Sequence, residues 1–307
     1  MPDSQLIIIG GGPAGLTAGI YAARSGLNAL LLEKGASGGQ LMNSYWIDNY
    51  PGFPEGISGF DLAEKMVSQA ERFKLPQKMQ TVASLDLGDK IKKVNLENGR
   101  ELTCNSIIIT TGARPKDLGV PGEKKLTGKG VSYCATCDGP FFKNQEIAVI
   151  GGGNTAVQEA DHLSRFASKV TIVHRRNKLK ADKILQEKAF ANQKIEFIWD
   201  SVVTEITGNK EVDGIGLQNK KGEESTLPVK GVFILIGIKP NKEILPLNIL
   251  ANQSGFIKTD QEMCASVPGV MAAGDIRDKE IRQIVNAAGE GAVACLAAQR
   301  YLAGLEK

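Results

Sequence analysis

Cys134 and Cys137 form the one CxxC pair of the chain. Two cysteines at this spacing can close a small disulfide ring and reopen it, and a thiolate is stabilised where the motif opens a helical turn. A CxxC beside a β-α-β unit in a cytosolic protein indicates redox activity. Asp138 follows directly and could exchange a proton during thiol chemistry, although an aspartate before Gly139 is also common in turns. We predict that Cys134, Cys137 and Asp138 are catalytic.

The same pair could instead be half of a zinc site, which would need two further ligands. The sequence has no second CxxC and no closely spaced pair of histidines. Its two histidines are His162 and His174, and His174 is better placed on a phosphate. We therefore expect no bound metal. The other three cysteines are isolated, and we expect them to be small buried side chains: Cys104, Cys264 and Cys295.

A dithiol needs a source of electrons, and the chain begins with a pattern that can hold one. Residues 6–9 are a continuous apolar run, typical of a strand buried on both faces of a parallel sheet. A Gly-x-Gly-x-x-Gly turn follows at 10–15, then a helical stretch at 16–24 and a second strand at 28–32 that ends at Glu33. Glycines in such a turn let the backbone approach a pyrophosphate.

The same pattern returns in the middle of the chain. Residues 146–150 predict a strand, 151–156 a second glycine-rich turn, and 169–173 the next strand, after a helix that runs to about residue 166. We therefore expect two dinucleotide-binding folds of the α/β class.

The residue that ends the second strand differs in charge between the two units. It is Glu33 in the first (33 − 10 = 23) and His174 in the second (174 − 151 = 23), where Arg175 and Arg176 follow. A carboxylate accepts hydrogen bonds from ribose hydroxyls, whereas guanidinium groups suit a 2′-phosphate. The second site should thus prefer NADPH. The first could hold NAD or FAD, and we predict FAD because a flavin and a nicotinamide exchange hydride directly.

Two segments look like crossings between these folds. Residues 111–115 and 236–241 each follow an apolar strand and carry a Gly-x-x-Pro pattern that cannot continue it. We expect two Rossmann-like domains, with the NADPH domain (115–243) inserted between the two parts of the FAD domain (1–114 and 244–307).

Composition excludes several other classes. The net charge is only +3, so attraction to nucleic acid or to a membrane surface is not expected. No run of about 18 apolar residues marks a membrane span, and the start of the chain lacks a signal-peptide pattern. We expect a cytoplasmic protein whose lone cysteines are thiols.

These motifs together resemble the low-molecular-weight, bacterial-type thioredoxin reductases over the whole chain. The matching segments are 10–15, 38–40, 49–52, 134–139, 151–156, 174–176, 273–275 and Arg282-Gln283. The resemblance implies an NADPH-dependent, homodimeric enzyme that reduces the disulfide of thioredoxin through FAD and the dithiol, with Cys137 facing the flavin. It also implies that Gln40 and Asn49 line the flavin and that Asp275 holds its ribityl chain.

The cofactor contacts that we expect fall into two sets. For FAD they are Gly10, Gly12, Pro13, Ala14, Gly15, Glu33, Gly39, Gln40, Asn49, Gly112, Asp275, Arg282 and Gln283. For NADPH they are Gly151, Gly153, Asn154, Thr155, Ala156, His174, Arg175, Arg176 and Lys180. Lys180 stands where the family usually has another arginine. Lysine keeps the charge but loses the planar fork, so discrimination against NADH could be weaker.

Alternatives to this function differ mainly in the partner. The same chemistry could serve a peroxiredoxin or a glutaredoxin-like protein, and the sequence does not name the disulfide substrate. A ferredoxin–NADP reductase would lack the dithiol, and a dithiol oxidase would lack a working nicotinamide site. A yellow protein that NADPH bleaches without oxygen would exclude a non-enzymatic nucleotide-binding module. Phe141 and Phe142, after the dithiol, are candidates for partner contact or for ordinary core packing. Because the flavin must meet both the nicotinamide and the dithiol, we expect the inserted domain to rotate.

Overall fold

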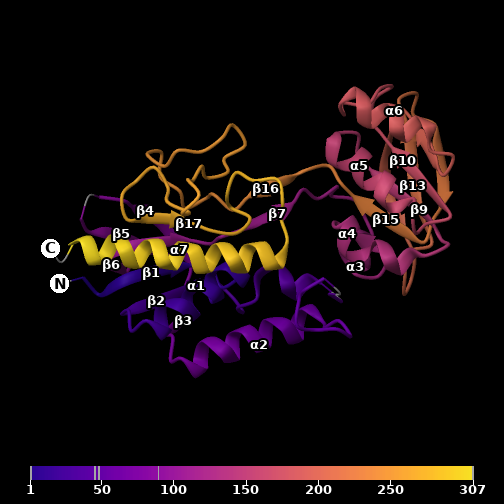
Figure 1. Cartoon of the computed structure of the whole chain (residues 1–307). Helices are drawn as coiled ribbons and strands as arrows, with labels where there is room; N and C mark the ends of the chain where they lie inside the picture. The colour runs from indigo at the N-terminus through magenta and orange to yellow at the C-terminus, as the bar shows by residue number, and fades with distance from the viewer. Residues whose placement is uncertain (1, 45, 48, 89, 306–307) are drawn as a thin grey trace. The chain divides into compact units, whose positions relative to one another are not determined.

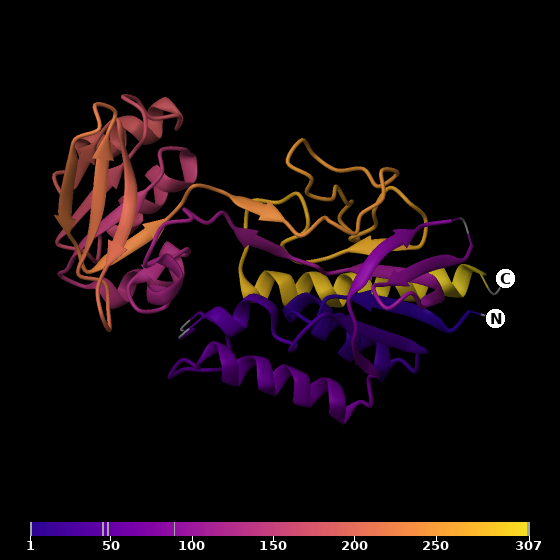
Figure 2. The same cartoon turned by 180° about the vertical axis from the view of Figure 1, so that it is seen from behind.

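The computed structural model describes residues 2–44, 46–47, 49–88 and 90–305. The chain divides into two compact units, one of residues 1–114 and 239–307 and one of residues 115–238. The second break therefore lies before the expected boundary at 243. The chain passes between the units through β7 (Ala113–Pro115) and β16 (Ile238–Pro240), which pair with each other (Figures 1 and 2).

The first unit is built on a mixed sheet with strand order β3-β2-β1-β6-β5-β4, in which β17 also pairs with β6. Its strands are β1 (Ser4–Ile9), β2 (Ala29–Glu33), β3 (Gln77–Met79), β4 (Val82–Asp86), β5 (Lys92–Leu96), β6 (Glu101–Ile109) and β17 (Val270–Ala272). Strands β3, β2, β1, β6 and β17 pair in parallel. Parallel strands end at one edge, so the glycine turn after β1, Glu33 and the segment after β17 leave the sheet at the same edge.

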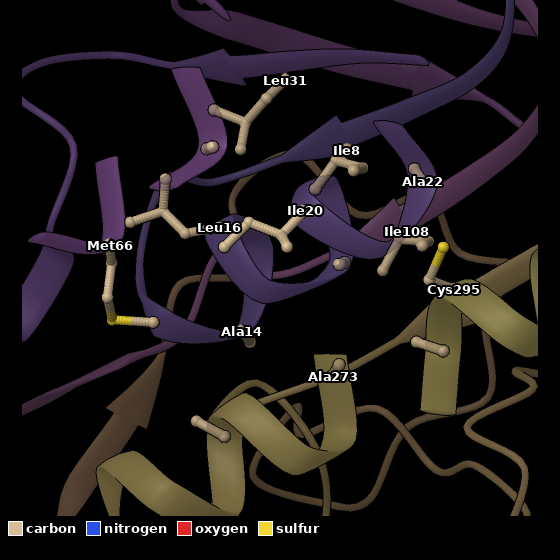
Figure 3. Packing of buried hydrophobic residues seen from close by; sticks show 14 of the residues in the cluster. Ile8, Ala14, Leu16, Ile20, Ala22, Leu31, Met66, Ile108, Ala273 and Cys295 are labelled. Carbon is tan, nitrogen blue, oxygen red and sulfur yellow. The ribbon is translucent and has the colours of Figure 1, made fainter. Parts of the chain in front are cut away.

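Helices α1 (Pro13–Arg24), α2 (Gly59–Arg72) and α7 (Ile284–Leu305) belong to this unit, with a short 3₁₀ helix, η1 (Gly39–Asn43). Figure 1 shows α7 running beside α1, and the two helices are in contact. Figure 3 shows the core between the sheet and these helices, where Ile8, Leu31 and Ile108 from the strands meet Leu16 of α1 and Cys295 of α7. Side chains on the other face of the sheet form a second buried cluster.

The second unit repeats this plan on a parallel sheet with strand order β11-β10-β9-β15-β8. Its strands are β8 (Val131–Ser132), β9 (Glu146–Ile150), β10 (Lys169–Val173), β11 (Ile195–Ile198) and β15 (Gly231–Ile234), and β12 (Ser201–Thr207), β13 (Gly214–Asn219) and β14 (Glu224–Pro228) form an antiparallel sheet. Its helices are α3 (Glu123–Leu126), α4 (Ala135–Asp138), η2 (Gly139–Phe142), α5 (Asn154–Leu163) and α6 (Lys183–Ala191).

The two β-α-β units predicted from the sequence are confirmed, with small differences at element ends. Strands β9 and β10 have the predicted bounds, whereas α5 ends at Leu163 rather than near residue 166. In the first unit, α1 begins at Pro13, where a missing backbone N–H costs no hydrogen bond. Within the described ranges, no helix is both long enough and apolar enough to cross a membrane.

Candidate functional site

The first glycine-rich turn joins β1 to α1. Gly10 has a φ of +110°, and a Cβ there would lie 2.4 Å from the carbonyl oxygen of Thr110. A Cβ on Gly15 would lie 1.8 Å from the carbonyl oxygen of Gly10, so the turn itself requires these two glycines. Gly12 is different, because its backbone is extended and an added Cβ would meet, among the described atoms, only the Cα of Gly39 at 4.0 Å. The backbone at Gly12 thus borders open space, as a pyrophosphate cradle requires.

The start of α1 is held against the C-terminal part of the same unit. Ala14 is buried, and a Cβ on Gly274 would lie 3.0 Å from the Ala14 Cβ. A Cβ on Gly291, in α7, would lie 2.2 Å from the carbonyl oxygen of Ala14. The helix N-terminus, whose free N–H groups favour an anion, therefore has a fixed position beside the segment that follows β17.

Glu33 ends β2 next to the turn. Its Oε2 accepts a hydrogen bond from the N–H of Gly11 at 2.6 Å, and its Oε1 accepts one from the N–H of Gly35 at 3.2 Å. A pocket of about 550 Å³ adjoins this carboxylate, lined by residues of β2, β3, α2 and the loop after Glu33. A carboxylate fixed in this way can accept hydrogen bonds from sugar hydroxyls and repels a phosphate.

Other residues predicted to bind the flavin lie in the same unit. Asn49 Nδ2 donates to Gln283 Oε1 at 3.1 Å, which joins two predicted residues that are distant in the sequence. Gly39 and Gln40 begin η1, with Gly39 facing Gly12. Gly112 has a φ of +70° between β6 and β7.

Asp275 and Arg282 carry buried polar atoms that lack hydrogen-bond partners in the described part of the chain. These atoms are Asp275 Oδ1 and Arg282 Nε. Burial raises the pKa of Asp275, and the nearby Lys279 and Arg282 oppose this rise. The Arg282 guanidinium also lies over the ring of Phe256, 4.7 Å from its centroid. Such unsatisfied buried atoms fit a bound polar cofactor.

In the second glycine-rich turn, too, the fold requires some of the glycines, whereas one of them borders open space. Gly151 has a φ of +152°, and a Cβ there would lie 2.6 Å from the carbonyl oxygen of Leu235. A Cβ on Gly152 would lie 2.4 Å from the imidazole ring of His174. An added Cβ on Gly153 would meet no described atom within 4 Å. Gly153 is thus the open position here, as Gly12 is in the first turn.

The segment after β10 is fastened to this turn. Asn154, the first residue of α5, exchanges two hydrogen bonds with Asp182: Asn154 Nδ2 donates to Asp182 Oδ2 at 2.8 Å, and the Asp182 N–H donates to Asn154 Oδ1 at 2.9 Å. The N–H of Lys180 donates to the carbonyl oxygen of Gly152 at 2.7 Å. Thr155 is exposed and Ala156 is buried below the turn.

The basic residues separate into one buried ring and three exposed cations. His174 is buried beneath the turn, and burial together with the charges of Arg176 and Arg175 lowers its pKa. Arg175, Arg176 and Lys180 are exposed. No ion pair engages Arg175 or Arg176 within the residues that the structure covers. Their guanidinium groups are therefore available to a phosphate.

The CxxC pair is closed as a disulfide. Cys134 immediately precedes α4, and its Sγ accepts a hydrogen bond from the N–H of Cys137 at 3.2 Å. The motif thus opens a helical turn, which is the condition under which its thiolate is stabilised. An N–H aimed at Sγ favours the thiolate of Cys134 once the pair is reduced.

Asp138 is linked to this pair through Ser132, a residue that the sequence analysis missed. The Ser132 hydroxyl donates to Asp138 Oδ2 at 2.6 Å and accepts from the N–H of Cys134 at 3.1 Å. Burial raises the pKa of Asp138, and the hydrogen bond from Ser132 opposes this rise. A serine two residues before a cysteine matches no motif, so only the fold could identify it.

The isolated cysteines and the phenylalanines follow the predictions in part. Cys104 and Cys295 are buried, and burial raises the pKa of each thiol to about 12. Cys264 is only half-buried, so the prediction of burial is wrong for this residue, which lies in a loop rather than in a strand or helix core. Phe141 is 47% exposed, whereas Phe142 is buried with its ring edge-on to another phenylalanine of the core. No cluster of metal-ligating side chains occurs in the described ranges.

Comparison with known proteins agrees with this geometry. Residues 4–291 match the family described as pyridine nucleotide-disulphide oxidoreductase. The chain is 47% identical to a thioredoxin reductase of Listeria monocytogenes over 99% of its own length and 95% of that protein, and 45% identical to one of Bacillus subtilis over 99% and 96%.

Solved structures give the same result. A thioredoxin reductase from Streptococcus pyogenes superimposes with a TM-score of 0.94 at 45% identity, covering 98% of each chain. One from Lactococcus lactis, described as in the FR conformation, has a TM-score of 0.68 at 44% identity, covering 98% of this chain and 100% of that one. With glycine turns and a CxxC disulfide placed as described, the chain belongs to the pyridine nucleotide-disulphide oxidoreductases and, within them, to the thioredoxin reductase family.

Proposed function

We propose that the protein reduces the disulfide of thioredoxin with electrons from NADPH, passed through FAD and the Cys134–Cys137 pair. The observation that carries this proposal is the disulfide at the start of α4, in the same unit as a glycine turn flanked by free arginines. The first unit supplies the other nucleotide turn, at residues 10–15, with the acidic Glu33 at its ribose-reading position.

The residues of the first unit fit FAD. The open backbone at Gly12 and the N-terminus of α1 would receive the pyrophosphate, and Glu33 would accept hydrogen bonds from the adenosine ribose. Asp275, whose side chain is partly exposed, and Arg282, whose buried Nε lacks a partner among the described residues, would bind the flavin end. When bound, the flavin would supply the step between a two-electron hydride donor and a dithiol.

The residues of the second unit fit NADPH better than NADH. Arg175 and Arg176 would bind the 2′-phosphate through charge-assisted hydrogen bonds, and Lys180 would add a third positive charge. The open backbone at Gly153 would face the pyrophosphate. The buried ring of His174 would support the turn, whereas the exposed cations would contact the phosphate.

The dithiol would act through thiol–disulfide exchange. Two electrons and two protons reduce the Cys134–Cys137 bond to two thiols, one of which attacks the partner disulfide as a thiolate. The other thiol then breaks the mixed disulfide, so that the partner leaves as a dithiol. Asp138 would hold or release the proton needed in these steps, and Ser132 fixes its carboxyl group. The resemblance favours Cys137 as the sulfur that faces the flavin.

We further propose that the second unit rotates as a rigid body between half-reactions. The paired strands β7 and β16 are the linkers. The relatives from S. pyogenes and L. lactis differ in TM-score (0.94 and 0.68) at similar identity and coverage, which supports more than one arrangement within the family. An engineered disulfide between the units should stop turnover and leave FAD bound.

The partner, the assembly and the location complete the proposal. Thioredoxin is the substrate that the relatives' name favours, and a peroxiredoxin or a glutaredoxin-like protein is the alternative. A homodimer in the cytoplasm is expected from the family resemblance.

The decisive experiment is NADPH oxidation by the purified protein in the presence of candidate disulfide proteins from the same genome. We expect a yellow protein that NADPH bleaches without oxygen and that turns over with a thioredoxin. A colourless protein that takes up no FAD would refute the flavin assignment. Turnover with a peroxiredoxin or a glutaredoxin-like protein but with no thioredoxin would select the alternative partner.

A further inference from the structure

A buried cluster of charges lies behind Asp275. It consists of Asp275, Arg277 and Lys279 from the segment after β17 and Glu290 from α7, and we call it the charge cluster. The side chains of Arg277, Lys279 and Glu290 are 12%, 10% and 8% exposed, whereas that of Asp275 is 31% exposed. Asp275 is thus the member of the charge cluster that a ligand can reach.

Glu290 fixes the geometry of this cluster. Its Oε2 accepts a hydrogen bond from the N–H of Gly274 at 2.8 Å, and its Oε1 lies 2.7 Å from the Arg277 guanidinium. A buried carboxylate is costly unless several partners satisfy it, and these partners do so. Glu290 therefore ties α7 to the backbone turn that carries Asp275.

Lys279 joins the two carboxylates of the cluster. Its Nζ lies 3.2 Å from both oxygens of Glu290, 2.8 Å from Asn286 Oδ1 and 3.4 Å from Asp275 Oδ1. The four charges sum to zero, and because Arg277 already pairs with Glu290, the charge of Lys279 can serve Asp275. Asp275 Oδ1 is buried and accepts no hydrogen bond from any described residue, so its compensation is ionic.

The charged groups around Asp275 act in opposite directions on its ionisation. Burial raises its pKa and so does the charge of Glu290, whereas Lys279 and Arg282 lower it. An ionised Asp275 accepts hydrogen bonds from hydroxyl groups, but a protonated one loses part of this capacity.

We propose that Lys279, anchored by Glu290, is a positioning residue that keeps Asp275 ionised and in place to accept a hydrogen bond from a hydroxyl group of the flavin's ribityl chain. This inference rests on the proposed function, in which Asp275 holds that chain. It assigns roles to two residues that no sequence motif marked, and it explains why α7 places a buried glutamate against the turn.

The experiment measures FAD binding to the apoprotein by quenching of flavin fluorescence, from about pH 5.5 to 8. Lys279→Met should weaken FAD binding about tenfold or more at neutral pH, as expected for a lost charge-assisted interaction. The loss should grow as the pH falls, because Asp275 then protonates more readily. Lys279→Arg should restore most of the affinity. Lys93→Met, which removes an exposed lysine paired with Glu101 in the same unit, is the matched control.

Two further measurements separate positioning from general damage. ADP lacks the ribityl chain, so Lys279→Met should weaken FAD binding but leave ADP binding unchanged. In a double-mutant cycle with Asp275→Asn, the two changes should be strongly non-additive, because one residue acts through the other. Where Lys279→Met does not fold, Lys279→Gln replaces it in both measurements.

Three outcomes would overturn the inference: wild-type FAD affinity in the Lys279 variants, equal losses for FAD and ADP, or additive effects in the cycle. Failure of the proposed function is distinguishable, because wild-type apoprotein would then bind no FAD at all.

Discussion

Replacing Gly12 by alanine separates the glycines that the fold requires from the glycine that a cofactor requires. The backbone at Gly12 has a φ of −76° and a ψ of −177°, a conformation that any residue adopts. The nearest described atom to an added Cβ is the Cα of Gly39, at 4.0 Å. Alanine therefore fits the folded protein, but its methyl group occupies the space that a pyrophosphate needs.

The expected effect on stability is small. A glycine-to-alanine change at a compatible backbone position stabilises by about 0.4–1 kcal/mol, since it restricts the unfolded chain. Gly12 is also the N-cap of α1, where alanine is worse than glycine by a comparable amount, about 1 kcal/mol at most. These effects oppose each other, so the Tm of the apoprotein should change by no more than about 4 °C.

The expected effect on FAD is large. Each hydrogen bond to a charged group contributes about 1.5–3 kcal/mol, so losing two of them weakens binding by roughly 100-fold or more. Gly15→Ala is the variant to compare with Gly12→Ala. Its added Cβ would lie 1.8 Å from the carbonyl oxygen of Gly10, so this change should destabilise the fold itself.

The assay pairs thermal unfolding of each apoprotein with FAD titration. We expect Gly12→Ala to be folded and colourless, and Gly15→Ala to be poorly folded. The reasoning is refuted if Gly12→Ala binds FAD with wild-type affinity, or if its apoprotein melts far below the wild type.

Four further predictions test the second unit and the thiols. Changing Arg175 and Arg176 to Ala should reduce the NADPH-to-NADH ratio of kcat/KM by roughly 10- to 1000-fold, whereas Arg165→Ala, an exposed arginine beyond α5, should leave it unchanged. Serine in place of either cysteine of the CxxC pair should abolish disulfide reduction but leave FAD bound and reducible by NADPH; retained activity would remove the pair from the mechanism. In the native oxidised protein, Cys264 should react with a thiol reagent while the two buried thiols, whose pKa burial raises to about 12, react only after unfolding. Burial raises the pKa of Asp138 above 3.8, so ionisation of this residue destabilises the fold as the pH rises. Asp138→Asn should therefore increase the free energy of unfolding at about pH 7 and lose this advantage near pH 4. Urea denaturation across this range measures the difference, and an advantage that grew on acidification would contradict the prediction.

Local patterns were enough to predict the two nucleotide-binding folds. A continuous apolar run, a glycine turn and a helix form one contiguous unit, because a parallel strand buried on both faces needs apolar residues throughout. The sequence therefore predicted β1, β9 and β10 closely. The redox pair itself could be identified because its spacing alone is chemically informative.

Packing shows which glycines of the first turn the fold itself requires. All three belong to one motif, and the approach of Thr110 and of the turn's own backbone sets Gly10 and Gly15 apart from Gly12. This approach depends on β6, which lies almost a hundred residues further along the chain and packs beside β1 in the sheet.

Tertiary structure also decided the partners of the polar residues. Ser132 reaches Asp138, Asn49 meets Gln283, and Glu290 of α7 supports the turn at Gly274. None of these contacts leaves a periodic or spaced signal, because each joins residues of different elements or loops and not regularly spaced positions in one helix or strand. The sequence by itself determined the two folds and the chemistry available to them, whereas packing between distant elements decided how each reactive group is held.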